Sequence, residues 1–269
     1  MLTDVLESLG LFMGHRQNQN EEAEFFKHLN VWLMRQAGAD WDQPAPFDAL
    51  LADAARRELF GEFLRYTLTT PRAVSYLGWP RYLRYRSVAR LDLPWGWKDP
   101  RSTFTLPFWL DLFPDARVLH IYRNGVDVAK SLCVRSQAGL AHFATWKRLH
   151  RRLAFSCWNQ LSPKLYVRHF SLNEGFALWE TYSRRADLHI AALPPERTRV
   201  VQYEGFLADP LPVIQDLCDF VGVPARSDGI QQAIATIKPD RARAYEQDAQ
   251  LREFYERIRH SPQMIKYGY

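Results

Sequence analysis

The chain has 269 residues, of which 47% are hydrophobic and 14% aromatic. This length and composition allow one large α/β domain with a substantial core, and they exclude a mainly disordered chain. The formal net charge of +5 and the pI near 9.1 favour an anionic partner, a class that includes phosphorylated nucleotides, acidic acceptors and nucleic acids.

Three cysteines, Cys133, Cys157 and Cys218, occur at a spacing that matches no zinc-binding pattern. Their odd number indicates reduced thiols, so we expect a cytoplasmic protein. The first residues include acids and lack the basic start and apolar run of a signal peptide. The sequence has no apolar run of about 18 residues, so we expect no transmembrane segment.

Apolar periodicity predicts helices that alternate with three short strands. The predicted helices span residues 2–13, 21–37, 47–67, 103–112, 173–192, 210–221 and about 245–259, with one more directly after the second strand. The predicted strands span residues 95–98, 116–122 and 199–203. Residues 41–46 and 71–92 are predicted to be irregular, and 138–172 receive no assignment. The alternation indicates a single α/β domain, residues 1–269, with a mostly parallel sheet.

The most informative segment begins where the strand over 116–122 ends. Arg123 follows the strand, a glycine turn comes next, and the helix after it carries Asp127 and Ser131. A guanidinium and a hydroxyl placed about two helical turns apart can hold one phosphate between them. The alternative is that Arg123 caps a strand end and Ser131 faces solvent. Asp127 lies in the first helical turn, where the helix dipole favours a carboxylate and a structural role is at least as plausible.

Other segments carry recognisable residues in a fixed order. They are 95–101 (Trp-Gly-Trp-Lys-Asp-Pro-Arg), 113–117, 123–131 and 203–210, the last followed by 220–223. Together they resemble the sulfotransferases that use PAPS (3′-phosphoadenosine 5′-phosphosulfate), in particular bacterial members of the P-loop sulfotransferase superfamily. The resemblance runs from about residue 1 to the final Tyr-Gly-Tyr and is weakest over 138–170. It implies a three-layer α/β/α fold with a mostly parallel, P-loop NTPase-like central sheet.

The resemblance also implies roles for the residues that would bind PAPS. Arg123 and Ser131 match the pair that binds its 3′-phosphate. Tyr203 matches a tyrosine near the adenine in some relatives, although a buried core tyrosine is the simpler account. Arg241 and Arg243 in the basic tail can close over the 3′-phosphate, or they can belong to a solvated run of charges.

Sulfuryl transfer needs positive charge near the breaking S–O bond and a base near the acceptor. Lys98 can neutralise the charge that builds on the bridging oxygen, or it can pair on the surface with the Arg101 cluster. Glu24 is our first choice for the base because it shares a helical face with His28. An acidic first helical turn explains the same glutamates without catalysis. The full set of candidate bases is Glu21, Glu22, Glu24, His28 and His120.

One family element has no counterpart in this chain. The family has a glycine-rich loop between its first strand and first helix, and the backbone of that loop cradles the 5′-phosphosulfate. The opening Met-Leu-Thr-Asp-Val-Leu-Glu resembles the helix that follows this loop. We therefore expect a domain truncated at its N-terminus, either because the gene start lies further upstream or because the loop was lost.

These observations lead to one main hypothesis and two alternatives. The main hypothesis is sulfuryl transfer from PAPS, without a metal, to a hydroxyl or amine of a small-molecule, carbohydrate or lipid acceptor. Trp79, Tyr82 and Tyr85 can line the acceptor cleft or belong to the core. The first alternative is a non-catalytic relative that binds a nucleotide or another anionic partner. The second is nucleic-acid binding through the arginine-rich stretches 81–90 and 147–152, but no nucleic-acid fold signature is present and we expect no such partner.

Overall fold

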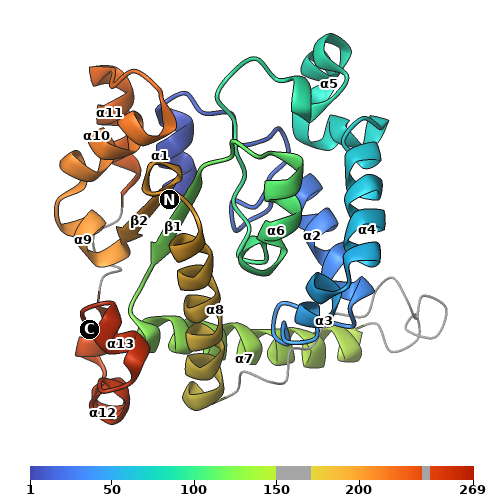
Figure 1. Ribbon diagram of the computed structural model, residues 1–269. Coiled ribbons are helices and arrows are strands. Elements are labelled where there is room, and N and C mark those ends of the chain that lie inside the picture. The colour runs from blue at the N-terminus through green and yellow to red at the C-terminus, as the bar shows by residue number, and fades with distance from the viewer. Residues whose placement is uncertain (150–170, 238–242) are drawn as a thin grey trace. The chain divides into compact units, whose positions relative to one another are not determined.

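The computed structural model describes residues 1–149, 171–237 and 243–269, with the side chains of 139–149 excepted (Figure 1). The chain divides into two compact units. The first unit comprises Met1–Ile121 and Leu188–Pro239, and the second comprises Tyr122–Asp187 and Asp240–Tyr269. Within the described ranges, no helix is both long enough and apolar enough to cross a membrane.

Helices dominate both units. The α-helices are α1 (Leu2–Ser8), α2 (Glu24–Gln36), α3 (Phe47–Ala52), α4 (Ala54–Thr67), α5 (Val74–Tyr85), α6 (Ser102–Leu112), α7 (Gly125–Leu149), α8 (Leu172–Ala192), α9 (Tyr203–Ala208), α10 (Pro210–Val221), α11 (Ser227–Thr236), α12 (Ala249–Ile258) and α13 (Pro262–Lys266). Short 3-10 turns are η1 (Pro71–Ala73), η2 (Val88–Arg90), η3 (Pro195–Arg197) and η5 (Ala244–Gln247). The predicted helices over 103–112, 173–192 and 210–221 are thereby confirmed.

In the described part of the chain, the sheet consists of two parallel strands, β1 (Val118–Tyr122) and β2 (Thr198–Gln202). Both had been predicted within two residues of these bounds, and together with the surrounding helices they confirm the α/β class. The predicted strand over 95–98 is instead one isolated parallel bridge, between Phe12 and Trp95. Phe12 donates its N–H to Pro94 O at 2.9 Å and accepts the N–H of Gly96 at 3.0 Å. Prolines at 94 and 100 flank the segment and lack the N–H groups that a longer ladder needs.

Three predicted helices differ in their extent. The helix over 2–13 ends at Ser8, since Gly10 has a φ of +98° and the chain then turns to reach Trp95. The helix over 47–67 divides at Asp53, whose carboxylate caps α4 by accepting the N–H of Arg56 at 2.9 Å. Side-chain capping thus outweighs the continuous apolar pattern there. The predicted helix over 21–37 begins at Glu24 instead.

The irregular structure predicted for 71–92 is wrong, because α5 occupies most of that stretch. Its backbone breaks at Gly78, where φ is +70° and ψ is 163°, and Pro80 begins the second part. Proline is favoured at a helix start, so the Gly-x-Pro pattern interrupts the helix without abolishing it. The small helices α9 and α11 had not been predicted.

The first unit has an apolar core that joins α1 to the sheet and to α10. Its fully buried members include Val5, Phe206, Ile214 and Leu217. A second group of the same unit is aromatic and centres on Phe26, whose ring stacks on that of Trp97 with centroids 4.0 Å apart. These contacts hold the segment around Trp97 against α2, which positions the residues that follow it.

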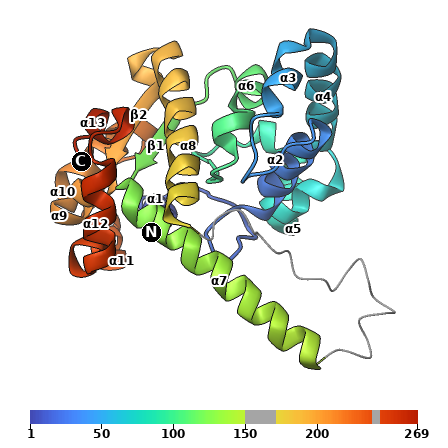
Figure 2. The ribbon, with the colours of Figure 1, turned by 90° about the horizontal axis from the view of Figure 1, so that it is seen from below.

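In the second unit, α7 and α8 pack closely against each other (Figure 2). A Cβ added at Gly175 would lie 3.0 Å from Ala129 Cα, so the glycine permits a close helix crossing. The unit's core continues to α12 and α13 through the rings of Phe176, Phe254 and Tyr267. Burial and the neighbouring Asp187 carboxylate raise the pKa of Tyr267, so its hydroxyl stays protonated.

We expect Gly125→Ala to lower the free energy of unfolding by about 2 kcal/mol. A Cβ at this position would lie 2.8 Å from ring atoms of both Phe176 and Trp179, so the rings must move. Gly61→Ala is the matched control, because a Cβ there meets no atom within 4 Å and the change should stabilise α4 by up to about 1 kcal/mol. Urea unfolding of the two variants measures both values. Equal stabilities would contradict the packing described here.

Candidate functional site

The turn between β1 and α7 is built by Asn124 and Gly125. Asn124 is fully buried, and its Oδ1 accepts the N–H of Val126 at 2.9 Å, which satisfies a free donor of the first helical turn. Trp179 Nε1 donates to the backbone oxygen of Arg123 at 3.1 Å. The backbone on both sides of the turn is therefore fixed, and Arg123 leaves the strand in a defined direction.

The side chain of Arg123 is held by a buried carboxylate. Its Nη2 donates to Asp127 Oδ2 at 2.9 Å, and the Asp127 side chain is 2% exposed. The other oxygen, Oδ1, accepts the backbone N–H of Tyr245 at 3.0 Å. Asp127 therefore links the guanidinium to a segment 118 residues further along the chain. This gives Asp127 the structural role that the sequence had allowed.

The guanidinium is not fully enclosed by these contacts. The Arg123 side chain is 28% exposed, while Ser131 lies on the surface of α7 one turn beyond Asp127. Burial raises the pKa of Tyr245 to about 12, so the phenol beside this segment stays neutral at physiological pH. The Arg123 guanidinium and the Ser131 hydroxyl therefore both lie near the N-terminal end of α7.

The remaining predicted nucleotide-binding residues fall in three places. Arg243 lies two residues before Tyr245, has a φ of +49° and is 64% exposed, with an ion pair to Glu246 at 3.7 Å. The structure therefore brings its backbone close to the Asp127 carboxylate. Tyr203 opens α9 in the first unit and is half-buried. Arg241 lies outside the described residues.

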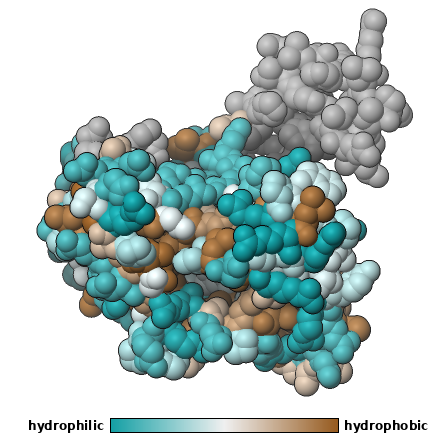
Figure 3. Space-filling view, turned by 90° about the horizontal axis from the view of Figure 1, so that it is seen from above, coloured by the Kyte–Doolittle hydropathy of each residue, from teal (hydrophilic) through white to brown (hydrophobic). Residues whose placement is uncertain are grey.

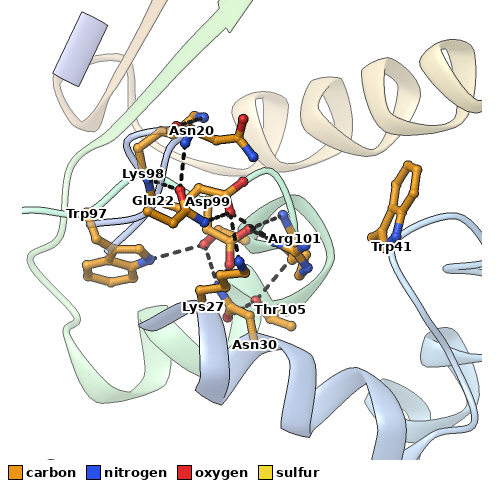
Figure 4. Close-up of polar contacts among 12 residues, drawn as sticks. Asn20, Glu22, Lys27, Asn30, Trp41, Trp97, Lys98, Asp99, Arg101 and Thr105 are labelled. Carbon is orange, nitrogen blue, oxygen red and sulfur yellow. Dashed lines mark hydrogen bonds and ion pairs between the residues drawn. The ribbon is translucent and has the colours of Figure 1, made fainter. Parts of the chain in front are cut away.

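The first unit contains a separate polar cluster that joins α2, α6 and the residues before α6 (Figure 4). At its centre is Asp99, whose side chain is fully buried. Its carboxylate accepts Arg101 Nη1 at 2.8 Å, the Arg101 backbone N–H at 2.9 Å and Asn30 Nδ2 at 2.8 Å. Burial raises the pKa of Asp99, and the Arg101 cation and the Asn30 amide oppose that shift.

Asn30 extends this cluster into the core. Its Oδ1 accepts the hydroxyl of Thr105 at 2.7 Å and the indole N–H of Trp109 at 2.8 Å. Each polar atom of the buried amide thereby has a partner, which buried polar groups require. The sequence had not singled out Asn30. The only signal for it was a polar residue within the apolar stripe of α2.

Glu22 lies at the edge of the cluster and is buried. Its Oε2 is 3.7 Å from Arg101 Nη1 and 3.8 Å from Lys27 Nζ, and it accepts Asn18 Nδ2 at 2.8 Å. The turn over 18–22 is fixed further by the Asn18 side chain, which accepts two backbone N–H groups. Glu22 is therefore a residue that orients Arg101 and the preceding turn.

Lys98 also contacts this turn. Its Nζ donates to the backbone oxygen of Asn20 at 2.8 Å, and the side chain is half-buried (Figure 4). This contact replaces the surface pairing with the Arg101 cluster that the sequence had allowed. Asp99 is bound to Arg101, whereas Lys98 points to the turn.

The other candidate bases are less closely tied to this cluster. Glu24 is the first residue of α2 and half-buried, and its backbone N–H donates to Arg16 O at 3.0 Å. His28 is exposed one turn further on. His120 is half-buried in β1. Within the described ranges, no group of three His, Cys, Asp or Glu side chains is placed to hold a metal ion.

Comparison with known proteins assigns the family. The chain matches the model of the sulfotransferase family over residues 9–228. The matched residues include the polar cluster around Asp99, the turn between β1 and α7 together with Ser131, and Tyr203. The chain belongs to the sulfotransferase family. Arg241 and Arg243 lie beyond the matched residues.

Two individual similarities are weaker. A UDP-glucose 4-epimerase of Mycoplasma pneumoniae (strain ATCC 29342 / M129 / Subtype 1) is 28% identical over 105 residues, 36% of this chain. The match spans only 28% of that enzyme's length. The solved sulfotransferase domain from the curacin biosynthetic pathway is 15% identical with a TM-score of 0.47, over 96% of this chain and 92% of that one. Neither similarity identifies a ligand of this chain, and the family match alone carries the assignment.

We expect Asp99→Ala to lower the free energy of unfolding by about 3 kcal/mol, because it removes the acceptor that the mostly buried Arg101 shares with the fully buried Asn30. Asp216→Ala is the control: it removes a carboxylate that pairs with Arg199 at 3.1 Å, with both side chains more than 40% exposed. That change should cost less than about 1 kcal/mol. Chemical denaturation of both variants tests the difference, and equal losses would show that the buried cluster does not support the fold.

Proposed function

We propose that this protein transfers a sulfuryl group from PAPS to a hydroxyl or amine. The observation that carries the proposal is the Arg123 guanidinium, fixed by Asp127 at the carboxyl end of β1 within the family match. Ligands of α/β folds bind at this end of the strands. A partly exposed guanidinium whose direction is set by a buried carboxylate fits a phosphate group, which binds arginine through charge-assisted hydrogen bonds.

In this proposal, three residues recognise the 3′-phosphate. Arg123 supplies the fixed positive charge. The Ser131 hydroxyl, one helical turn after Asp127 on α7, supplies a neutral donor. Arg243 is exposed on the segment that Asp127 holds through Tyr245, so its side chain can turn toward the anion. Arg241 and Tyr203 are proposed as the further contacts, to the 3′-phosphate and to the adenine.

The chemistry requires charge stabilisation and proton removal. Bound PAPS supplies the sulfuryl group and leaves as adenosine 3′,5′-bisphosphate. Lys98 is proposed to stabilise the negative charge on the leaving oxygen, because among the described residues its ammonium donates to a single backbone acceptor, so it can form further hydrogen bonds. No metal is needed for this role.

Glu24, supported by His28 one turn away, is proposed as the base that accepts the proton of the acceptor. Glu22 suits the role less well, since its carboxylate already interacts with Arg101, Lys27 and Asn18. The proposed role of Glu22 is to orient the turn that Lys98 contacts. The acceptor is proposed to be a small molecule, a carbohydrate or a lipid.

We expect Arg123→Ala to weaken the binding of adenosine 3′,5′-bisphosphate by about 30-fold, the equivalent of about 2 kcal/mol for a lost hydrogen bond to a charged group. Arg135→Ala is the matched control, because Arg135 is an exposed arginine of the same helix. Isothermal titration measures both affinities, and thermal melting verifies that each variant is folded. Unchanged affinity in a folded Arg123→Ala protein would refute this assignment.

We expect Lys98→Ala to reduce the rate of sulfuryl transfer by about 100-fold while nucleotide affinity changes little, because the lysine acts mainly on charge that develops in the transition state. Release of adenosine 3′,5′-bisphosphate from PAPS in the presence of phenol, sugar and lipid acceptors measures the rate. Lys266→Ala, an exposed lysine that pairs with Asp187, is the control. Tight nucleotide binding by the unaltered protein without transfer to any acceptor would instead favour a non-catalytic relative.

A further inference from the structure

The segment from residue 71 to residue 91 carries several positive charges and no acidic residue of its own. It contains five arginines and no aspartate or glutamate. It is also fully described, and it lies within the first unit. The arginines are Arg72, Arg81, Arg84, Arg86 and Arg90, and all five side chains are exposed.

Few of these charges are neutralised by neighbours. Arg84 pairs with Asp92 at 3.1 Å, with both side chains at least 59% exposed, so the pair is weak in water. Arg81 lies over the ring of Phe12 at 4.2 Å and Arg86 over that of Tyr82 at 5.7 Å, contacts that leave the charge intact. Among the described residues, Arg72 and Arg90 form no ion pair. The segment therefore presents a net positive surface.

Two large apolar side chains stand among these arginines. Trp79 is 64% exposed and Leu83 is 57% exposed, four residues apart and hence on one side of α5. Five of the eleven exposed large hydrophobic residues of the described part lie between 59 and 83. They are Leu59, Phe63, Tyr66, Trp79 and Leu83. Exposed apolar side chains that gather among polar ones are typical of a surface that binds a partner or a membrane.

The backbone is shaped to present Trp79. Gly78 has a φ of +70°, a conformation that favours glycine, and a Cβ there would make a tight contact of 3.2 Å with the ring of His15. The break places Trp79 at the start of the second part of α5, before Pro80. Its ring contacts Tyr82 edge-on with centroids 6.3 Å apart. The exposed indole is thus held in position by a specific local structure.

We propose that the exposed side chains of residues 71–90, from η1 through α5 to η2, bind the surface of an anionic lipid bilayer; they are Arg72, Trp79, Leu83, Arg84, Arg86 and Arg90. Figure 3 looks from above onto the side of Figure 1 on which α5 lies, and hydrophobic side chains are interspersed there with strongly hydrophilic ones. Arginines attract anionic headgroups, while tryptophan and leucine enter the boundary between headgroups and acyl chains. Trp79 and Leu83 favour a bilayer over nucleic acid as the partner. Binding of nucleic acid would depend on the arginines, whereas an exposed leucine contributes little to it.

Vesicle sedimentation tests the proposal on the full chain. We expect binding to phosphatidylcholine vesicles that contain 30% phosphatidylglycerol to be at least about tenfold stronger than to pure phosphatidylcholine, because the arginines act by charge. The double variant Trp79→Ala/Leu83→Ala and the double variant Arg72→Glu/Arg90→Glu should each reduce binding by about tenfold or more. The control for the first is Leu188→Ala, which removes an apolar side chain of 64% exposure elsewhere. The control for the second is Arg226→Glu/Arg252→Glu, with the same change of net charge.

A spectroscopic measurement identifies the inserted residue directly. Lipids brominated on their acyl chains should quench part of the protein fluorescence, and Trp79→Phe should abolish that quenching while circular dichroism shows a folded chain. Quenching that survives in Trp79→Phe, or no binding of the full chain to anionic vesicles, would overturn the proposal. So would tighter binding to duplex DNA that depends on the arginines and not on Trp79 and Leu83. These outcomes are independent of sulfuryl transfer, which is assayed with PAPS in solution.

Discussion

The candidate nucleotide site depends on one buried carboxylate, that of Asp127. It holds the Arg123 guanidinium with one oxygen and the backbone N–H of Tyr245 with the other. A long side chain loses conformational freedom when a ligand fixes it, and a preformed ion pair reduces that loss. The same carboxylate also fixes the segment that carries Arg243. Thus one acidic residue determines the direction of one arginine and the backbone position near another.

The polar cluster of the first unit uses the same principle. Asp99 is fully buried and binds Arg101, while Glu22 faces Arg101 from the turn over 18–22. Lys98 adjoins Asp99 in sequence but remains outside that network and contacts Asn20. The fold thereby separates a structural arginine from a lysine that keeps hydrogen-bonding capacity. This separation is what a lysine needs if it is to act on a ligand and not on the core.

The sequence predicted local features well where a single physical signal dominates. Pro210 and Gly222 mark the ends of α10, and the strand before Arg123 is a clear apolar run. Prediction from the sequence failed where two signals compete. At Asp53 a cap divides a continuous apolar pattern, and at Gly78 a break interrupts a helix. Arg123, Asp127 and Ser131 could be grouped as a candidate site because they lie close together in sequence. The bond to Tyr245 and the Asn30 network join distant residues, and periodicity contains no information about them.

The central claim is that the Arg123 site recognises a 3′-phosphate. The most direct measurement compares the affinity of the unaltered protein for adenosine 3′,5′-bisphosphate and for adenosine 5′-monophosphate at one ionic strength. We expect the first nucleotide to bind at least about tenfold more tightly, because only it carries the group that Arg123 and Ser131 would hold. Equal affinities for the two nucleotides, or no binding of either, would contradict the account.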